Sequence, residues 1–408
     1  MKIMILSQTP PSLQCTAGIT LDGICQQLKP HLVCNAVLLN PRQAYLKNNT
    51  SIDIPYLFLP KPIESGIPIP PQLSSLDKPL RPLRDTASWL LYRYQMRAFP
   101  KLIKKITAFA SQHNIDSIVA NLDTPGPILT ALAVAKNLQL PLYTMVFDPP
   151  EWHMTAYNMA PATIRYVKKV FDETVASSTC CAVIAQPMAD EYKKLYGVAT
   201  QVIQHSLPES MGQPCQSTLS DKEHLYIGMA GQLYAREAWE SLLAMLGANN
   251  WTIAGRKVII RYMGRGPLSP SNEPQHIEWL GWRDQRDAVR LLAECDVLYC
   301  PYPFKPEEKD VARLSFPSKI TLYLAAARPI LFHGPAYSSP VEFFIRTQSG
   351  FSVTEVAGEG LQKSLERLIN EPDLYASMCQ NAYTVFRNEF TSSAMRKNIL
   401  RFLALDAE

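Results

Sequence analysis

The sequence lacks any apolar run long enough to cross a membrane. No uninterrupted stretch approaches the ~18 residues that a spanning helix needs. The opening segment MKIMILSQTPP is interrupted by Pro10 and Pro11, so it is too short for the apolar core of a signal peptide and indicates a first strand. We therefore expect a cytoplasmic protein, either free or in peripheral contact with the inner face of a membrane.

Clustered metal ligands are also missing. The nine cysteines are scattered, none forms a C-x-x-C pair, and none has a histidine at metal-ligand spacing. This excludes an obvious zinc site and favours reduced thiols. No Asp-x-Asp pair follows a strand of the second half, so no carboxylate seat for magnesium is evident. The expectation is a site without a metal or another cofactor.

Strong charge of either sign is absent. The net charge is +4, with 47% hydrophobic and 19% charged residues, which is typical of a soluble globular protein. This mild basicity suits anionic ligands or a membrane surface and does not call for nucleic acid. A length of 408 residues exceeds one ordinary hydrophobic core, so two domains are expected.

Short apolar runs alternate with helical patterns, which predicts two α/β domains, each a doubly wound parallel sheet. In the first half, strands are expected at 3–6, 33–39, 117–121, 142–147 and 180–185, and helices at 20–29, 84–113, 126–137, 160–177 and 187–196. In the second half, strands are expected at 224–231, 257–264, 277–282, 296–302, 329–332 and 350–356, with helices at 236–247 and 284–294.

Three segments interrupt this alternation. Residues 54–83 are rich in proline and predict a long surface loop without a regular helix. Residues 84–106 mix basic and aromatic side chains, and either pack as an ordinary helix with solvated cations or form a face for a membrane surface or an acceptor. Residues 206–222 are polar with proline and glycine, and indicate a linker between a domain at 1–205 and a second at 223–388.

Polar residues follow several strands of the second half. Gly231 ends the first of them, where a glycine lets the backbone approach a ligand, and Arg236 then begins a helix and could bind phosphate oxygens. A second strand ends in a glycine-rich turn that contains Arg265. This turn does not follow the G-x-G-x-x-G pattern of nicotinamide-binding proteins.

Two further strand ends carry candidate residues. Gly281 and Trp282 could lie against a flat ring such as a nucleobase, although Trp282 could equally be a packing residue, and Asp284 is a candidate helix N-cap. In SFPSKITLYLAAARPILFHG, Ser318 and Lys319 begin a helix. Either Ser318 caps that helix, or the pair holds a phosphate group at its N-terminus.

The first half offers acid–base candidates. In VFDPPEWHM, Asp148 follows a buried strand, where it could act as a base for an acceptor hydroxyl or simply cap a turn, and His153 lies close behind it. His205 follows the last strand of the first half. In the second half His333 follows the strand PILF, where it could approach a sugar or serve the core.

Together these segments resemble a known family. The order and spacing of GMAGQLYAREAWESLL, IEWLGWRDQRDAVRLLAECDVLYCPY and FPSKITLYLAAARPIL are similar to the donor domain of group 1 glycosyltransferases, glycosyltransferase family 4, over about 160 residues. MILSQTPPSLQCTAG and LYTMVFDPPEW resemble the family's first half more loosely. The resemblance implies the GT-B fold, with two Rossmann-like domains facing a cleft, and a helix at 389–408 that packs back on the first domain.

The resemblance also implies an activity: retaining, metal-independent transfer of a sugar from a nucleotide sugar to a glycan, polysaccharide or lipid-linked hydroxyl. It places Gly231 and Gln232 at the donor phosphates, and Arg236 and Lys319 at the leaving diphosphate. It further implies that Gly281, Trp282 and Arg283 border the base, and that Gly18 lies in an N-terminal loop that faces the sugar.

One departure from the family pattern keeps other functions open. Many members carry two glutamates near the last helix, where this sequence has Leu314 and Leu322. Leucine cannot accept a hydrogen bond from a ribose hydroxyl. Either ribose is held by Glu307, Glu308 or Asp310, or the donor site is impaired. The alternatives are therefore a pseudo-enzyme that serves as a binding or scaffold subunit and, less favoured, a nucleotide-sugar epimerase.

Overall fold

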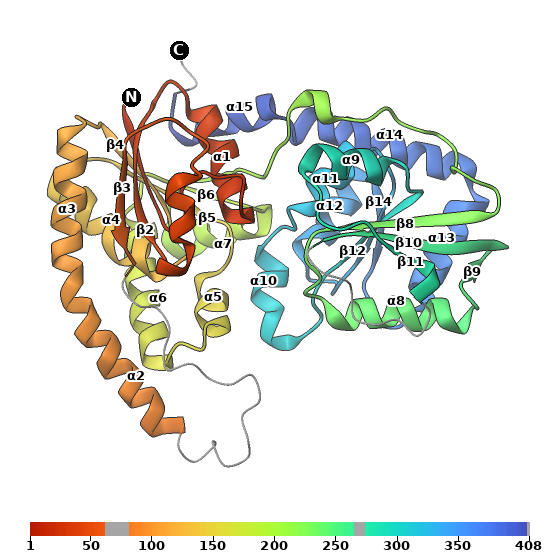
Figure 1. The fold of residues 1–408 in the computed structure, drawn as a ribbon, viewed down its shortest axis with the longest axis horizontal. Helices are drawn as coiled ribbons and strands as arrows, with labels where there is room; N and C mark the ends of the chain where they lie inside the picture. Colours follow the sequence, from red (N-terminus) through yellow and green to blue (C-terminus); the bar gives the residue numbers. More distant parts are fainter. Residues whose placement is uncertain (62–80, 265–273, 406–408) are drawn as a thin grey trace. The chain divides into compact units, whose positions relative to one another are not determined.

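The chain folds into two compact units (Figure 1). The computed structural model describes residues 1–61, 81–264 and 274–405. Unit 1 contains Met1–Ile203 together with the chain from Arg396 onward, and unit 2 contains Gln204–Met395. Unit 2 therefore includes the expected linker, because the Thr321 hydroxyl donates to the carbonyl of His205 (3.1 Å) and the amide of Gln213 donates to that of Ala325 (2.8 Å).

Unit 1 is built on one sheet of seven parallel strands in the order β3-β2-β1-β4-β5-β6-β7. The strands are β1 (Ile3–Ser7), β2 (Leu32–Leu39), β3 (Tyr56–Pro60), β4 (Ser117–Asn121), β5 (Leu142–Val146), β6 (Cys180–Val183) and β7 (Thr200–Val202). All residues of β1 and β5 are buried, as expected for central strands covered on both faces.

The helices of unit 1 connect successive strands. They are α1 (Thr16–Leu28), η1 (Pro41–Asn48), α2 (Arg81–Gln95), η3 (Met96–Ala98), α3 (Phe99–Gln112), α4 (Pro125–Leu138), α5 (Pro150–Ala156), α6 (Pro161–Ala176) and α7 (Gln186–Tyr196). Residues from Arg396 onward, in the last part of α15 (Ser392–Phe402), belong to this unit, where the Arg396 guanidinium donates to the carbonyls of Gln27 (3.1 Å) and Lys29 (3.2 Å).

Unit 2 repeats this plan with the strand order β11-β10-β8-β12-β13-β14, and β9 pairs antiparallel with β10. The strands are β8 (His224–Ala230), β9 (Thr252–Ile253), β10 (Arg256–Met263), β11 (Ile277–Trp279), β12 (Val297–Pro301), β13 (Ile330–His333) and β14 (Gly350–Val353). Its helices are η4 (Glu209–Met211), α8 (Arg236–Ala248), η5 (Pro274–His276), α9 (Gln285–Ala293), η6 (Pro306–Glu308), α10 (Lys309–Leu314), α11 (Lys319–Ala325), α12 (Ser339–Thr347), α13 (Glu359–Asn370) and α14 (Pro372–Glu389).

In both sheets the order in which successive strands are added reverses beside the first strand of the unit. Strand order runs outward from β1 through β2 to β3 and then returns to β4 beside β1, and in unit 2 β12 likewise returns beside β8. Open parallel sheets bind ligands at such switch points, beyond the carboxyl ends of the strands. The predicted doubly wound sheet is therefore confirmed for each half of the chain.

Several local predictions were wrong. The proline-rich segment 54–83 is not loop throughout, because Tyr56–Pro60 form the edge strand β3, and an edge strand tolerates prolines at its ends. Residues 62–80 of that segment lie outside the described residues. The single helix expected at 84–113 is divided by a 3₁₀ turn at Met96–Ala98. The short strands β7 (three residues) and β9 (two residues) carry too few residues for a clear apolar run.

Candidate functional site

A glycine turn ends β8 at the switch point of unit 2. Gly231 has φ +89°, which a residue with a side chain adopts only under strain. Its amide donates to the carbonyl of Met263 at the end of β10 (2.8 Å), and its own carbonyl accepts from the Tyr262 hydroxyl (3.0 Å). These bonds fix the turn that carries Gln232 and Tyr234 into α8.

Lys319, the first residue of α11, lies over this turn. Only 7% of the residue is exposed, and a Cβ atom at Gly231 would stand 3.9 Å from its Cε. The ammonium donates to the carbonyl of Gln232 at 3.4 Å and stands 5.3 Å from the centre of the Tyr234 ring. Burial lowers the pKa of Lys319, partly offset by Cys300.

The Lys319 ammonium pairs with no carboxylate in residues 1–61, 81–264 and 274–405. A buried cation with one long hydrogen bond is poorly compensated for the water it has lost. An anion that contacted the Gly231 turn would supply the missing partner. The site is therefore chemically suited to a phosphate or diphosphate.

Ser318 precedes this lysine and is exposed. It occupies the N-cap position of α11, but its side chain makes no capping hydrogen bond. The helix it precedes has only seven residues. The group at this position that is best suited to attract an anion is thus the buried ammonium of Lys319, and not the N-terminus of this short helix.

Arg236 is the first residue of α8, but its guanidinium is exposed and pairs with Glu240 one turn on (3.2 Å). The side chain therefore points along its own helix and not onto Lys319. The adjacent Glu237 forms an ion pair with Lys305 (3.3 Å). Of the two cations that the sequence placed at a diphosphate, the structure brings only Lys319 against the glycine turn.

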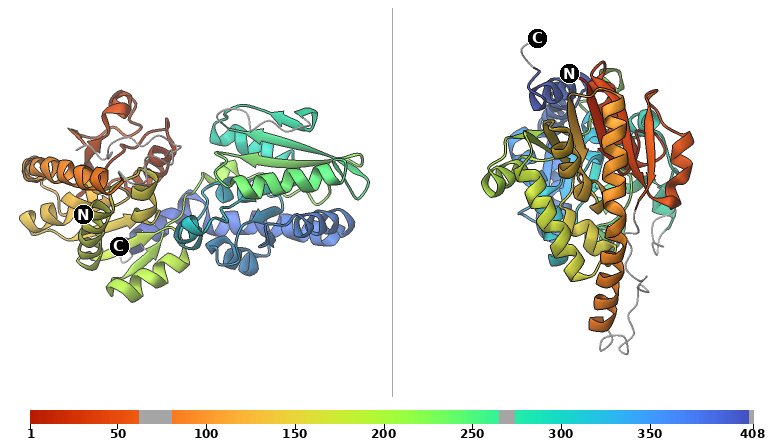
Figure 2. Two further views of the ribbon diagram at one scale, coloured as in Figure 1. Left: turned by 90° about the horizontal axis from the view of Figure 1, so that it is seen from below. Right: turned by 90° about the vertical axis from the view of Figure 1, so that its left-hand side faces the viewer.

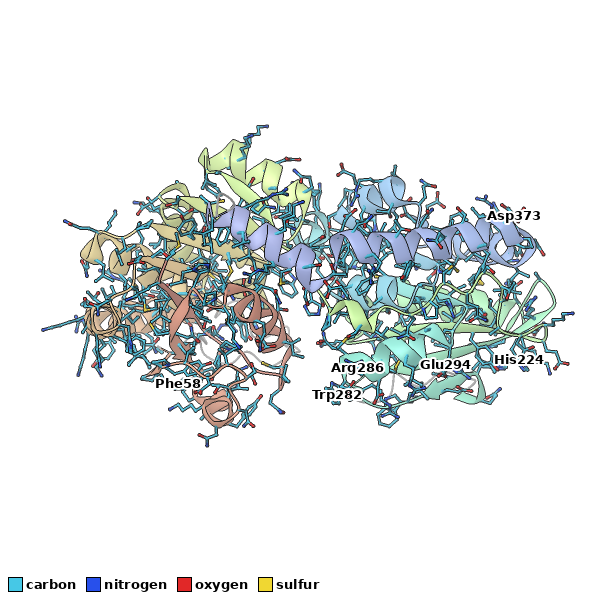
Figure 3. All side chains as sticks on the ribbon, turned by 90° about the horizontal axis from the view of Figure 1, so that it is seen from above. Phe58, His224, Trp282, Arg286, Glu294 and Asp373 are labelled. Atoms are coloured by element: carbon cyan, nitrogen blue, oxygen red, sulfur yellow. The ribbon has the colours of Figure 1, made fainter. Side chains whose placement is uncertain are left out.

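The strand end after β11 adjoins this turn through the backbone. Gly281 has φ +74° and its carbonyl accepts from the amide of Gly264, while the amide of Gly231 meets the carbonyl of Met263. Trp282 is 55% exposed, so the packing alternative is wrong, and Figure 3 labels it at the end of unit 2 where α9 begins. The Arg283 guanidinium donates to the carbonyl of Trp282 (3.1 Å).

Two other predictions near this strand end have clear outcomes. Asp284 is confirmed as the N-cap of α9, because its carboxylate accepts from the amide of Asp287 (2.9 Å). Arg265 lies outside the described residues.

His333 is fully buried at the end of β13. Its Nδ1 lies 2.8 Å from the Tyr299 hydroxyl, and its Nε2 lies 2.8 Å from the carbonyl of Glu355. Burial lowers its pKa. Since both ring nitrogens have partners within unit 2, the core role is favoured over an approach to a sugar. His205 is also buried, with Nε2 2.8 Å from the Gln285 amide nitrogen and a pKa lowered to about 4 by burial.

Both leucines that replace the family's glutamates lie in helices. Leu314, the last residue of α10, is 4% exposed and packs in the core, and Leu322 is half-buried in α11. Of the acidic residues expected to replace them, Glu307 and Glu308 lie in η6 and Asp310 lies in the first turn of α10. Of these, Glu308 lies near Glu237, whose charge adds to burial in raising its pKa.

Unit 1 holds a second group of ionisable residues at the carboxyl edge of its sheet. Asp148 follows β5, and Asp123 follows β4 and accepts from the amide of Phe147 (3.4 Å). Burial and the nearby charge of Asp148 raise the pKa of Asp123 to about 7. His153 in α5 is half-buried, and its pKa is lowered by burial and by Lys61, while Asp148 opposes the shift.

Lys61 completes this group from the end of β3. It is 6% exposed, its ammonium donates to the Gln8 side chain (2.5 Å), and burial lowers its pKa to about 7. The sequence reasoning missed Asp123 and Lys61. Asp123 was detectable, because NLDTP repeats the strand–Asp–Pro pattern of VFDPP. Lys61 was not, because the proline-rich segment concealed its strand.

Gly18 was expected in a loop, but it lies in the first turn of α1 (Thr16–Leu28). A Cβ atom there would stand 2.6 Å from the carbonyl oxygen of Ser12. Close approach of the preceding segment explains the glycine.

The part of the chain that the structure describes contains no group of three or more His, Cys, Asp and Glu side chains arranged to hold a metal ion.

Comparison with solved structures identifies the architecture. HepE from Anabaena, solved in complex with UDP, superposes with a TM-score of 0.66 at 15% identity and covers 99% of this chain and 100% of its own. Sucrose-phosphate synthase from Thermosynechococcus elongatus gives 0.65 at 11% identity, covering 99% and 98%. The UDP-forming trehalose-phosphate synthase from Burkholderia xenovorans, in complex with glucose-6-phosphate, gives 0.62 at 12% identity, covering 99% and 100%.

The sequence itself matches no family model and no curated protein. At these identities the likeness extends to the fold, over essentially the whole chain. The chain therefore has the two-domain GT-B fold of the glycosyltransferases.

The unpaired ammonium of Lys319 generates a prediction about stability. Because the folded pKa is lower than the unfolded one, folding is penalised at neutral pH, and the penalty is relieved as pH rises towards the unfolded pKa. Lys319→Met should thus raise the free energy of unfolding at pH 7 in the absence of ligand, because it removes the cost of burying the charged ammonium. Urea denaturation measures it, with the exposed Lys222→Met as the matched control that should change little.

The raised pKa of Asp123 predicts the opposite dependence of the free energy of unfolding on pH. Unfolded chains lose this proton near pH 4 and the folded protein near pH 7, so stability falls as pH rises across that interval. Asp123→Asn, which mimics the protonated form, should leave stability unchanged at pH 4 and raise it by on the order of 3 kcal/mol at pH 8. Equal effects at both pH values in urea titrations would contradict this assignment.

Proposed function

We propose that this chain is a glycosyltransferase that moves a sugar from a nucleotide diphosphate sugar to a hydroxyl acceptor. The observation that carries the proposal is the buried Lys319 ammonium, which lies against the Gly231 turn at the switch point of unit 2 without a carboxylate partner among the described residues. The fold supports it, since structures that share this fold include HepE bound to UDP and to UDP-glucose.

In this proposal the donor diphosphate occupies the space over Gly231 and Gln232. As the bond between the anomeric carbon and the diphosphate oxygen breaks, negative charge grows on the diphosphate and Lys319 stabilises it. Ser318 offers a hydroxyl beside it. Arg236 would have to leave Glu240 to join, which costs little because that ion pair is exposed.

The nucleoside would extend towards the neighbouring strand ends. Gly281, Trp282 and Arg283 supply a backbone turn, an exposed aromatic face and a guanidinium beside Gly264. The candidates to accept hydrogen bonds from the ribose hydroxyls are Glu307, Glu308 and Asp310, because the side chains of Leu314 and Leu322 cannot accept a hydrogen bond.

The acceptor would be prepared by unit 1. Asp148 takes the proton of the attacking hydroxyl, with Asp123 and His153 beside it to set its charge. We assign the acceptor to a glycan, a polysaccharide or a lipid-linked sugar, and the transfer to retention of the anomeric configuration. The hydroxyl then attacks the anomeric carbon from the face on which the diphosphate leaves, because one-step attack from the opposite face would invert that carbon.

The second candidate is a binding or scaffold subunit. The packing of Leu314 in the core, where the family has a carboxylate, is the observation that favours it. Absence of any nucleotide binding would favour this candidate, whereas turnover of a nucleotide sugar without an acceptor would favour an epimerase.

Nucleotide binding tests the role of Lys319. A ligand of the folded state raises the melting temperature by mass action, so at least one of UDP, GDP, ADP and dTDP should raise that of the wild type. Lys319→Met should weaken binding by about tenfold or more and reduce kcat/KM by about 10²-fold with the matching nucleotide sugar. Lys319→Arg should recover only part of the loss, because a forked guanidinium does not replace a point charge.

The control is Lys222→Met, which removes an exposed lysine of the same unit and should leave both measurements unchanged. Arg236→Ala should reduce kcat/KM in the same direction as Lys319→Met. If none of the four nucleotides shifts the melting temperature, the donor site is wrong.

The response to a chelator tests whether the transfer is independent of a metal ion. Since the proposal gives the leaving diphosphate to Lys319 and Arg236, turnover should persist in EDTA. The measurement is nucleotide release from the nucleotide sugar with and without the chelator. Complete loss of activity in EDTA, restored by magnesium or manganese, would mean that a divalent cation performs the role assigned to Lys319.

A further inference from the structure

One outward row of side chains runs along α2, η3 and α3. Its members recur every three or four positions, as single residues or as adjacent pairs, so that they share one side of the helical segment. We call it the 83–105 row: Leu83, Ala87, Leu90, Leu91, Tyr94, Arg97, Lys101, Lys104 and Lys105, all of them exposed. Figures 1 and 2 show α2 extending beyond the other helices of unit 1.

The first half of the row is apolar. Leu83 is 71% exposed, Leu90 59%, Leu91 46% and Tyr94 66%. Single exposed leucines are common, but four large apolar side chains on one side of a helix form a continuous patch. Such a patch requires a partner or a non-aqueous phase.

The opposite side of the same segment is already occupied. Tyr92 is 7% exposed, and the Trp89 ring lies 5.9 Å from that of Tyr166 in α6. Farther along, Leu102 and Ile106 of α3 are buried. The apolar row is therefore a second face of the segment, separate from the one that packs on unit 1.

The second half of the row is basic. Residues 84–106 contain six basic residues and one acidic residue, a net charge of +5 in a chain whose total is +4. The Arg97 guanidinium lies 5.4 Å from the centre of the Tyr94 ring, which joins the two halves. Apolar and cationic side chains on one outward face match the boundary between acyl chains and phosphate headgroups.

An open cavity of about 540 Å³ adjoins the basic half, between α3 and α4. Ile103, Ala108 and Ala133 line it, with Lys104 from the row at its side. The Thr107 hydroxyl in this cavity is buried and has no hydrogen-bond partner in the described structure. The basic half of the row therefore has apolar surface beside its cations.

We propose that the 83–105 row is the surface through which unit 1 binds an anionic phospholipid bilayer. The leucines and Tyr94 enter the region between headgroups and acyl chains, and Arg97, Lys101, Lys104 and Lys105 meet lipid phosphates. This contact lies on the surface and involves no spanning helix: among the described residues, no helix has both the length and the apolar character to cross a bilayer.

The charge decides between a bilayer and a second copy of this chain. Two copies joined through this face would bring two segments of net charge +5 together, and like charges oppose that contact. An anionic bilayer attracts each lysine or arginine near its surface. The proposal requires no sugar transfer and stands apart from the donor site.

Vesicle flotation tests it with the full-length protein. The wild type should float with vesicles of equal parts phosphatidylcholine and phosphatidylglycerol, float far less with phosphatidylcholine alone, and be released as salt is raised. The triple variant Leu90→Ser/Lys101→Glu/Lys105→Glu should bind the anionic vesicles at least tenfold more weakly.

The matched control is Leu195→Ser/Lys193→Glu/Lys194→Glu on α7, which removes the same residue types from exposed positions of the same unit and gives the same net charge. It should bind like the wild type, and both variants should unfold at the wild-type temperature. Absence of wild-type binding, equal binding to neutral vesicles, or equal loss in the control overturns the proposal. A concentration-dependent dimer abolished only by the row variant would instead assign the face to a second copy.

Discussion

The site of each unit depends on one constraint of parallel sheets: every strand ends at the same edge, and the strand order must reverse once. Between β8 and β12 the connections lead away in opposite directions, which exposes backbone that helices cover elsewhere. In unit 2 this edge is tied together by the bonds from Gly231 to Met263 and from Gly264 to Gly281. Unit 1 obeys the same constraint, and its reversal between β1 and β4 lies beside Gln8 and Asp123.

Two buried cations of unit 2 differ in how far protein groups compensate their burial. Arg328 is 4% exposed and donates to the carbonyls of Cys295 (3.0 Å) and Ala327 (3.0 Å) and to the Gln216 side chain (2.6 Å). Those partners compensate its desolvation, as a buried charge requires. Lys319 is buried to a similar degree, but among the residues that the structure describes its ammonium makes one hydrogen bond, of 3.4 Å. The two side chains therefore differ in hydrogen bonding and not in burial.

The sequence predicted what depends on local pattern. Continuous apolar runs predicted β1, β5 and β12, and Asp284 was identified as an N-cap because a capping carboxylate acts within one turn. It could also have predicted the pairing of Arg236 with Glu240, which lies within one helix and follows from the i,i+4 spacing. It could not predict outcomes that depend on distant partners. The full burial of His333, between the Tyr299 hydroxyl and the carbonyl of Glu355, follows from tertiary packing, which residue type and spacing do not encode.

The same limit applies to the two units' ionisable residues. Lys319 was recognised from its place after a proline-serine turn, but its lack of a carboxylate partner among the described residues is a property of the folded unit. Burial raises the pKa of Asp123, and the charge of Asp148, which lies on a different strand end 25 residues along the chain, raises it further. Only the sheet order brings the two together.

Leu314 and Leu322 limit which part of a nucleotide the proposed site would recognise. Leu314 fills core volume and Leu322 is an apolar side chain on α11, so neither helix offers a carboxylate acceptor to ribose at these positions. The position of the Lys319 ammonium does not depend on them, because it bonds to the carbonyl of Gln232 beside the Gly231 turn. In the proposed site, recognition would rest on the diphosphate, which all nucleotide sugars share, and selectivity for the nucleoside would have to come from the turn at Gly281 and Trp282. Such a site would discriminate by the fit of the base against an exposed ring more than by hydrogen bonds to the sugar of the nucleoside.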